Sequence, residues 1–292
     1  MKQSLRFTNR NRRFRCLKME IKKAIRNRSA VISYSLVLGL VLFHGIRAVA
    51  LYEDLYDYWN SGNMPGNPMI TSMSLFCRWL GADVTSFEGN LFYYLLPVFA
   101  VLPYGGSLVE EIKSGYTKNI LHKVSRRTYF LSKYIAVFCT GALVIGVPLL
   151  LNFTILSFFL PAIPMDSIYP YGVIGEKSMW ADLYFEQPWL YTFLYILLDM
   201  IFAGIIAGIS TAVAFFTKHK PVVLLSPFFV LMVIDFADNL LSSGWELSPM
   251  KFLHVLPVAN DRTEVGILLF AVVLFFLTFG IVWVKGGKSE AL

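Results

Sequence analysis

Six long runs of apolar residues divide this chain, and each is long enough to cross a lipid bilayer as a helix. About 20 helical residues span the roughly 30 Å of hydrocarbon. Polar, aromatic and charged segments separate the runs. The pattern predicts an all-α polytopic membrane protein with one transmembrane domain over residues 30–284. The spans are expected at residues 30–51, 90–109, 130–160, 189–216, 221–241 and 263–284.

Two of these spans are irregular. The second contains Pro97 and Pro103, followed by Gly105 and Gly106, so we predict a kink or a break near its inner end. The third is longer than a bilayer requires. We expect it to end near Leu151, with the residues after it lying at the outer surface.

Lysine and arginine are concentrated in alternate segments between the spans. Residues 1–29, 110–133, 217–220 and 285–292 contain 21 of the 26 basic residues. Because Lys and Arg mark the cytoplasmic side, both termini and the loop 110–133 are predicted to be cytoplasmic. The other segments hold only Arg47, Arg78, Lys177, Lys251 and Arg262.

The composition agrees with a chain surrounded by lipid. Hydrophobic residues make up 56% of the sequence and charged residues only 15%, with a mean hydropathy of +0.59, whereas about a quarter of a soluble domain is charged. The net charge of +7 averages a basic inner face and a more acidic outer face. We therefore attribute the basic tail to topology and to attraction for anionic lipid, not to nucleic acid. The predicted location is the inner or plasma membrane.

The segment before the first span is predicted to lie on the inner membrane surface. Residues 1–29 form a basic tail, and within it residues 17–28 have the spacing of an amphipathic helix. Met19 is a second candidate start of the chain. A cleaved signal peptide is the alternative, with Ala48–Ala50 as its cleavage site, but its basic and apolar parts are both too long. The shared helix face contains Leu17, Ile21, Ala24, Ile25 and Arg28.

The segments predicted to be outside are residues 52–89 and 161–188, which we expect to form ordered caps on the membrane. The six tryptophans are expected outside the spans or at their ends, as in interfacial belts. Cys16, Cys77 and Cys139 fall in the tail, an outer loop and a span, so we predict no disulfide and no metal site.

The inner loop 110–133 contains the most informative pattern. Ile112, Tyr116, Ile120 and Val124 are each four residues apart, and the residues between them are mostly polar or charged. This spacing predicts a short amphipathic helix, to which Leu121 adds and which Gly115 separates from the preceding span. Two interpretations remain open: a solvated connector between spans, or a docking element for a cytosolic partner.

The same loop resembles the permease subunits of ABC-2 family ABC transporters. In that family a glutamate precedes a glycine by four residues, and a Val-Ser-Arg sequence follows, with a lysine seven residues later. Here Glu111 precedes Gly115, Val124–Arg126 supplies the triplet, and Lys133 follows. Two positions differ, because Tyr116 replaces a threonine and Lys123 replaces a proline. The motif covers about 25 residues, while six spans and an N-terminal surface helix extend the resemblance over most of the chain.

The resemblance implies the permease subunit of an exporter, with both termini in the cytoplasm. Glu110–Arg127 would contain the coupling helix, between spans two and three, and residues 17–28 the connecting helix. The implied partners are a separate ATPase subunit, which binds ATP and magnesium, and a second permease chain, identical or paralogous. The residues implied in ATPase coupling are Glu110, Glu111, Gly115, Tyr116, Leu121, Ser125, Arg126, Arg127 and Lys133.

The chain is not expected to hydrolyse ATP or to bind a cofactor itself. A P-loop requires two glycines, five residues apart, before its Lys-Ser or Lys-Thr pair. Gly287–Ser289 matches only the end of that motif, because Val282 stands where the first glycine is needed. We therefore interpret residues 285–292 as a polar cytoplasmic tail.

Three acidic residues within the predicted spans are candidates for the substrate path. Asp199 lies near the middle of the fourth span, where a charge is costly and faces protein or water. Asp235 and Asp238 lie on one face near the outer end of the fifth. The alternatives are a protonated or hydrogen-bonded packing residue for Asp199 and a helix end in water for the pair. His44 and Arg47 are predicted to pair with outer acids such as Glu53 or Asp54.

Two other functional classes compete with transport. Some intramembrane metalloproteases carry two glutamates followed by an arginine, but here Gly115 stands where that arginine is needed. The four histidines are also too scattered for a zinc site. A membrane scaffold or sensor subunit is the second alternative.

Overall fold

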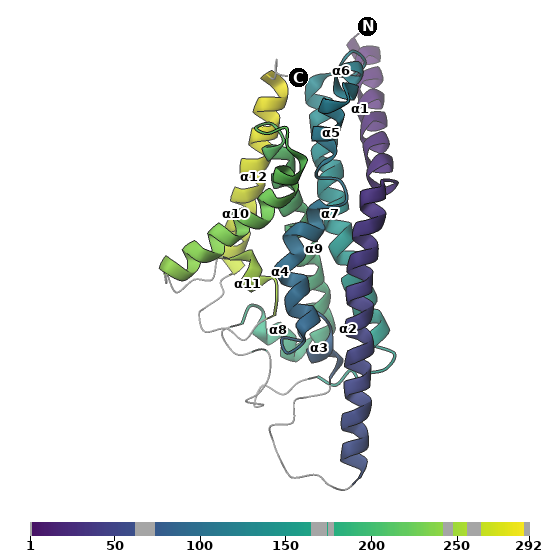
Figure 1. Ribbon diagram of the computed structural model, residues 1–292, viewed down its shortest axis with the longest axis vertical. Helices are drawn as coiled ribbons and strands as arrows, with labels where there is room; N and C mark the ends of the chain where they lie inside the picture. The colour runs from purple at the N-terminus through teal and green to yellow at the C-terminus, as the bar shows by residue number, and fades with distance from the viewer. Residues whose placement is uncertain are drawn as a thin grey trace.

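The chain folds into a bundle of α-helices, shown by a computed structural model that describes residues 2–61, 74–164, 174, 178–241, 248–255 and 264–288 (Figure 1). These residues form twelve helices and no strand. The helices are α1 (Lys2–Ile25), α2 (Arg28–Asn60), α3 (Leu75–Arg78), α4 (Phe87–Val101), α5 (Ser107–Lys113), α6 (Tyr116–Leu121), α7 (Arg126–Leu156), α8 (Ala181–Glu186), α9 (Pro188–Val213), α10 (Lys220–Leu241), α11 (Pro249–Phe252) and α12 (Glu264–Lys288).

Five helices in the described part of the chain are long and apolar enough to cross a membrane: α2, α7, α9, α10 and α12. They indicate a membrane-embedded protein. The segment expected as the second span differs, because α4 is only 15 residues long and stops at Val101. The chain then turns at Pro103, Gly105 and Gly106 before α5 begins, so the predicted break is confirmed.

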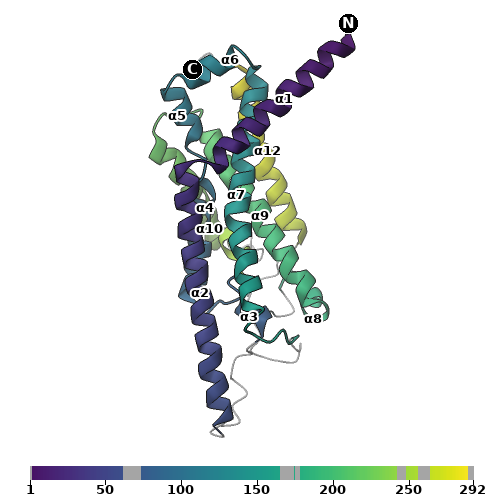
Figure 2. The same ribbon diagram turned by 90° about the vertical axis from the view of Figure 1, so that its right-hand side faces the viewer.

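The start of α1, the end of α12 and the short helix α6 all lie at one end of the bundle (Figures 1 and 2). We call this the basic end, because it also carries the loop 110–125. The short helices α3 and α8 lie at the opposite end. Helix α10 leans away from the bundle axis (Figure 1).

The centre of the bundle is the contact between α7 and α9, the most extensive between any two helices. Gly141 of α7 faces Ala207 of α9 so closely that a Cβ at Gly141 would lie 2.6 Å from the Ala207 Cβ. Such a Cβ would also lie 3.0 Å from the carbonyl oxygen of Ala100. Small residues let helix backbones approach closely in membranes, where dispersion contacts replace the hydrophobic effect between helices. Helix α9 is therefore the central helix, with 67% of its most apolar stretch buried.

The surface helix expected over residues 17–28 is part of a longer helix. α1 begins at Lys2 and ends at Ile25, and Arg28 already belongs to α2 because Asn27 caps that helix through the amide of Ser29. Its buried face also differs from the expected one. Cys16, Glu20 and Ala24 are buried against α7, whereas Ile25 is exposed.

The third expected span is one continuous helix, which passes Leu151 and Pro148 and ends at Leu156. The first extends nine residues beyond its expected end, to Asn60. Parts of both outer caps, residues 62–73, 165–173 and 175–177, lie outside the described residues. Trp79 lies outside the spans, as expected, but it is fully buried in the cap next to α3. All three cysteines are free thiols.

The close contact between α7 and α9 predicts that Gly141→Ala destabilises the protein. The added methyl group must displace backbone or Ala207, and overpacking of this kind costs about 1–3 kcal/mol. The measurement is the apparent unfolding temperature of the purified protein in detergent. Gly39→Ala is the matched control, because a Cβ at Gly39 meets nothing within 4 Å. Equal unfolding temperatures for the two variants would show that the α7–α9 contact tolerates the extra volume.

Candidate functional site at the basic end

The loop between α4 and α7 forms two short helices joined by one glycine. Gly115 adopts a left-handed conformation, with φ of +72°, which L residues with a Cβ rarely adopt. It turns the chain from α5 into α6. Ser125 then caps α7 by accepting a hydrogen bond from the amide of Thr128. The predicted short helix set apart by Gly115 is therefore present.

α6 packs one face on the bundle and exposes the other. Ile120 is buried against Tyr129 and Phe130 of α7. Ile112 of α5, and Tyr116 and Leu121 of α6, are partly buried against the same cluster, so the inward apolar face is confirmed for these residues. The series does not lie on one helix, because α5 ends at Lys113 and α6 ends at Leu121, before Val124. Ten residues in the segment 110–127 are exposed, of which five are cationic and one is anionic: Glu110, Lys113, Ser114, Lys118, Asn119, His122, Lys123, Ser125, Arg126 and Arg127.

Beneath this loop lies a fully buried lysine. The side chain of Lys133, on α7, is 0% exposed, and its Nζ donates to Glu20 Oε2 of α1 at 3.0 Å. The same Nζ lies 2.9 Å from Oε2 of Glu111 on α5 and 3.0 Å from the hydroxyl of Tyr104. A buried ammonium group is stable only when it is paired and hydrogen-bonded.

A second lysine completes the pairing. Lys23 of α1 lies 3.2 Å from Glu111 Oε1 and 3.6 Å from Glu20 Oε1, so two lysines balance two glutamates. Its Nζ also lies 3.7 Å from the centre of the Tyr116 ring, at the start of α6. We call these four charged residues, Glu20, Lys23, Glu111 and Lys133, the inner charge cluster.

Two tyrosine hydroxyls add hydrogen bonds to the carboxylate oxygens that face Lys133. Tyr104 donates to Glu20 Oε2 at 2.8 Å, and Tyr129 donates to Glu111 Oε2. Burial alone would raise the pKa of Glu111, but the charge of Lys133 and the Tyr129 hydrogen bond lower it below its ordinary value. Burial would lower the pKa of Lys23, yet its contacts with Tyr116 and Glu111 raise it. Both groups are therefore charged at neutral pH.

The cluster explains why Glu111 and Lys133 occur together in the motif, because their side chains form one ion pair. The other residues of this network were not predicted from the sequence. Glu20 lies 113 residues from Lys133, but one signal was available: it is the only acidic residue in a tail with eleven basic ones. Tyr104 and Tyr129 gave no signal beyond their place beside the loop.

A separate ion pair links α5 to α10. Glu110 accepts a hydrogen bond from Lys220, the first residue of α10. The Lys220 side chain crosses Gly106, where an added Cβ would meet its Cε at 2.9 Å. Between α1 and α5 lies a polar cleft of about 480 Å³. It is lined by residues that include Lys22, Lys23, Arg26, Glu110 and Glu111.

The acidic residues expected along a substrate path are not at this site. Asp199 of α9 is fully buried and accepts a hydrogen bond from Tyr93 of α4 at 2.8 Å. The Tyr93 ring stacks on His254, with 4.5 Å between ring centres. Asp235 and Asp238 lie 3.9 and 2.9 Å from Lys251, which belongs to α11. The hydrogen-bonded packing interpretation of Asp199 therefore has a direct structural basis.

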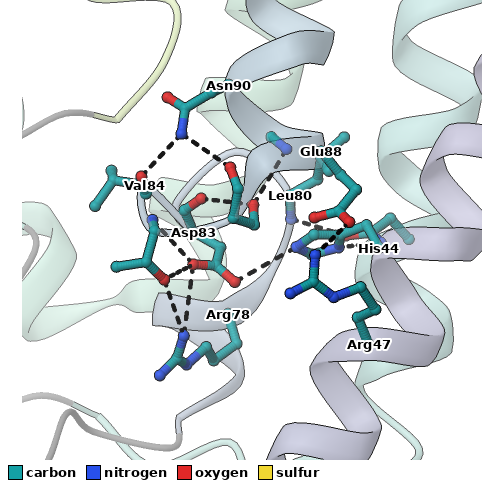
Figure 3. A network of polar contacts seen from close by, with 12 residues as sticks. His44, Arg47, Arg78, Leu80, Asp83, Val84, Glu88 and Asn90 are labelled. Carbon is teal, nitrogen blue, oxygen red and sulfur yellow. Dashed lines mark hydrogen bonds and ion pairs between the residues drawn. The ribbon is translucent and has the colours of Figure 1, made fainter.

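At the opposite end, His44 and Arg47 pair with acids of the outer segment, as expected, although not with the examples Glu53 and Asp54. His44 Nε2 lies 3.5 Å from Asp83, and Arg47 lies 2.7 Å from Glu88 (Figure 3). Asp83 lies in the loop after α3, and Glu88 lies in the first turn of α4.

Asn152 of α7 anchors the same network. Its oxygen accepts from the Leu80 amide at 2.8 Å, and its nitrogen lies 3.1 Å from His44 Nδ1. Burial would raise the pKa of Asp83, but hydrogen bonds from His44 and Thr85, together with the charge of Arg78, lower it.

No protein-family model matches the chain, and no curated protein matches it significantly. The four histidines lie on different elements: His44 in α2, His122 directly after α6, His219 directly before α10 and His254 after α11. Among the described residues there is no group of three or more His, Cys, Asp or Glu side chains that could hold a metal ion.

Removing the central cation should release α1 from the bundle. In Lys133→Met two buried carboxylates lose their shared partner, which costs about 3–5 kcal/mol. The measurement is maleimide labelling of Cys16, which is 3% exposed on the buried face of α1, in a variant that lacks Cys77 and Cys139. We expect labelling to accelerate at least severalfold. Lys118→Met, at an exposed position of α6, should leave the rate unchanged; an unaltered rate in Lys133→Met would contradict the role of the cluster.

The lowered pKa of Glu111 predicts how stability depends on pH. A carboxyl whose folded pKa is depressed stabilises the fold above its unfolded pKa, about 4.3 for glutamate, and loses that contribution as pH falls through the folded value. Glu111→Gln should therefore lower the unfolding temperature at pH 6–8, and the difference should shrink progressively as the pH falls below about 4.3. A difference that persists unchanged in acid would show that the carboxylate charge is not responsible.

Proposed function

We propose that this chain is the permease subunit of an ATP-binding-cassette exporter, working with a separate ATPase subunit. The observation that carries the proposal is the inner charge cluster. It joins the loop that contains α6 to two structures at once, the surface helix α1 and the membrane helix α7. A force applied to the exposed face of α6 therefore reaches the bundle without passing through a flexible linker.

The proposed topology has six membrane crossings and both termini in the cytoplasm. Five crossings are the long apolar helices, and the sixth is α4 with the residues that follow it up to residue 109. The position of α6 at the same end as the start of α1 and the end of α12 supports this arrangement. The concentration of Lys and Arg there gives the direction.

In the proposed mechanism, the chain converts closure of the ATPase into a rigid-body movement of its helices. ATP and magnesium bind to the partner, and α6 occupies a cleft on it. Gly115 sets the angle at which α6 meets the partner. Glu111 and Lys133 transmit the displacement to α7, while Glu110 transmits it to α10 through Lys220.

The second permease chain and the substrate path belong to the proposal as well. Helix α10 exposes most of its apolar surface in the single chain, which suits contact with lipid or with another chain. Asp199, Asp235 and Asp238 remain candidates for contact with substrate. The chemical class of the substrate is open, and a peptide, an antibiotic and a lipid-like molecule all fit the resemblance.

Two rivals are distinguished by ATP dependence and by Glu110. An intramembrane protease requires that Glu110→Gln abolish cleavage of a substrate without any need for ATP. In the structure Glu110 is instead bonded to Lys220, and its side chain is 53% exposed. A scaffold or sensor subunit requires no ATPase activity linked to this chain.

Copurification from native membranes tests the partner. A protein with a P-loop should be recovered with the chain, and its ATPase rate should depend on the presence of the chain. Recovery of no ATP-binding protein would remove the basis of the proposal.

Substitution of Gly115 tests the coupling role more directly than copurification does. Gly115→Val should lower ATPase-linked transport by about tenfold or more, because a β-branched residue is strained in the left-handed conformation. Gly115→Asn is the matched control, since asparagine adopts this conformation readily. A Cβ at this position meets nothing within 4 Å, so any difference comes from the backbone and not from a clash. Membrane abundance must be equal, and equal transport by the two variants would contradict the coupling role.

A further inference from the structure

A groove opens at the basic end between α1, α7 and α12, and its lining changes from polar to mostly apolar along its length. Its volume is about 430 Å³. Ser125, Arg127 and Thr128 line the part at the start of α7. Leu131, Ile135 and the nearly buried Ser132 line the part farther along that helix. The other walls are Phe14 and Leu17 of α1 and Trp283 of α12.

The polarity follows one face of α7. Arg127, Leu131 and Ile135 are four residues apart, so they lie along one side of the helix. At 1.5 Å per residue, the distance from Arg127 to Ile135 along the axis is about 12 Å. A ligand in this groove therefore meets a cation and a pair of hydroxyls, hydrogen-bonded to each other at 2.8 Å, at one end. Over the next two turns it meets mainly the hydrocarbon side chains of Leu131 and Ile135.

The cationic end of the groove is well placed for a phosphate group. Arg127 is exposed in the first turn of α7, where the helix dipole favours negative charge. Its guanidinium carbon lies 5.2 Å from the centre of the Trp283 ring. Stacking on a ring orients the guanidinium plane and leaves its N–H groups free to donate in that plane. Gly287 of α12 lies beside it, since an added Cβ there would be in ordinary van der Waals contact with Arg127 Nε, at 3.4 Å.

We infer that this groove binds one anionic phospholipid. The phosphate lies at Arg127 with the hydroxyls of Ser125 and Thr128, and an acyl chain runs along Leu131 and Ile135. Phe14 and Trp283 are 68% and 43% exposed, so aromatic surface is available to cover that chain. A soluble anion would leave the apolar part empty. The site depends on membrane insertion and not on transport, so it stands or falls separately from the proposed function.

The occupant also has a structural consequence. Leu17 lies three residues before Glu20 on α1, so a lipid in the groove contacts the helix that the inner charge cluster holds. The same lipid touches α12, which has no member of that cluster. A bound phospholipid therefore connects α1 to α12 at the membrane surface.

The test is native mass spectrometry of the purified full-length protein in detergent, titrated with long-chain phosphatidylglycerol. Phosphatidylcholine with the same acyl chains provides the comparison. We expect the first phosphatidylglycerol to bind at least about tenfold more tightly, since each tenfold corresponds to about 1.4 kcal/mol. Short-chain, water-soluble phosphatidylglycerol and inorganic phosphate should both bind at least tenfold more weakly than the long-chain lipid. Equal affinities for phosphatidylglycerol and phosphatidylcholine, or for long and short chains, would overturn the inference.

Substitutions at the groove test whether the lipid binds there. Arg127→Gln should weaken the first phosphatidylglycerol by about tenfold, because a charge-assisted contact to phosphate is lost, and should leave phosphatidylcholine unchanged. Lys118→Gln removes the same charge from the exposed face of α6 and should change neither affinity. Trp283→Leu changes the wall of the groove and should also weaken binding of the first phosphatidylglycerol. Equal weakening by Arg127→Gln and Lys118→Gln would reveal a general effect of charge and overturn the site.

Discussion

The pairing requirement of one buried cation organises the basic end of the molecule. Lys133 has no exposed surface, and its partners come from α1, from the turn after α4 and from α5. An unpaired charge at that depth would cost several kcal/mol. Pairing with Lys133 therefore holds all of these segments against α7. The loop that carries α6 is consequently an extension of the bundle and not a flexible connector.

The interior of the bundle depends on a different force. Between α7 and α9 the contact is close and largely apolar, and Gly141 brings the two backbones together. Dispersion contacts of this kind are short-ranged and shape-specific, so the two helices are expected to move as one body. The ion pairs of the basic end then act on a rigid unit, and displacement of α5 is delivered to α7 and α9 jointly.

The sequence predicted what depends on local pattern and missed what depends on distant partners. Apolar runs predicted α9 and α10 almost to the residue, because a helix in lipid must satisfy its own backbone. Pro103, Gly105 and Gly106 predicted the break after α4, and Gly115 predicted the separation of α6. By contrast, nothing local joins Glu20 to Lys133, or His44 to Asp83, since folding of the intervening chain brings these pairs together. The length of α1 was missed because its early residues are too polar to form an apolar pattern.

The distribution of ion pairs also indicates which helix is free to respond. α2 is fixed at its start, where Asn27 donates to the carbonyl of Pro103, and again at Arg47, which binds Glu88 thirteen residues before the helix ends. α10 is the least buried of the long helices and leans away from the bundle. Yet its first residue, Lys220, binds Glu110 on α5, the residue beside Glu111. Under the proposed function, one displacement of the loop therefore reaches the packed core through Glu111 and the peripheral helix through Glu110. Because the core resists deformation and α10 does not, the relative movement that opens a path is expected between α10 and the rest.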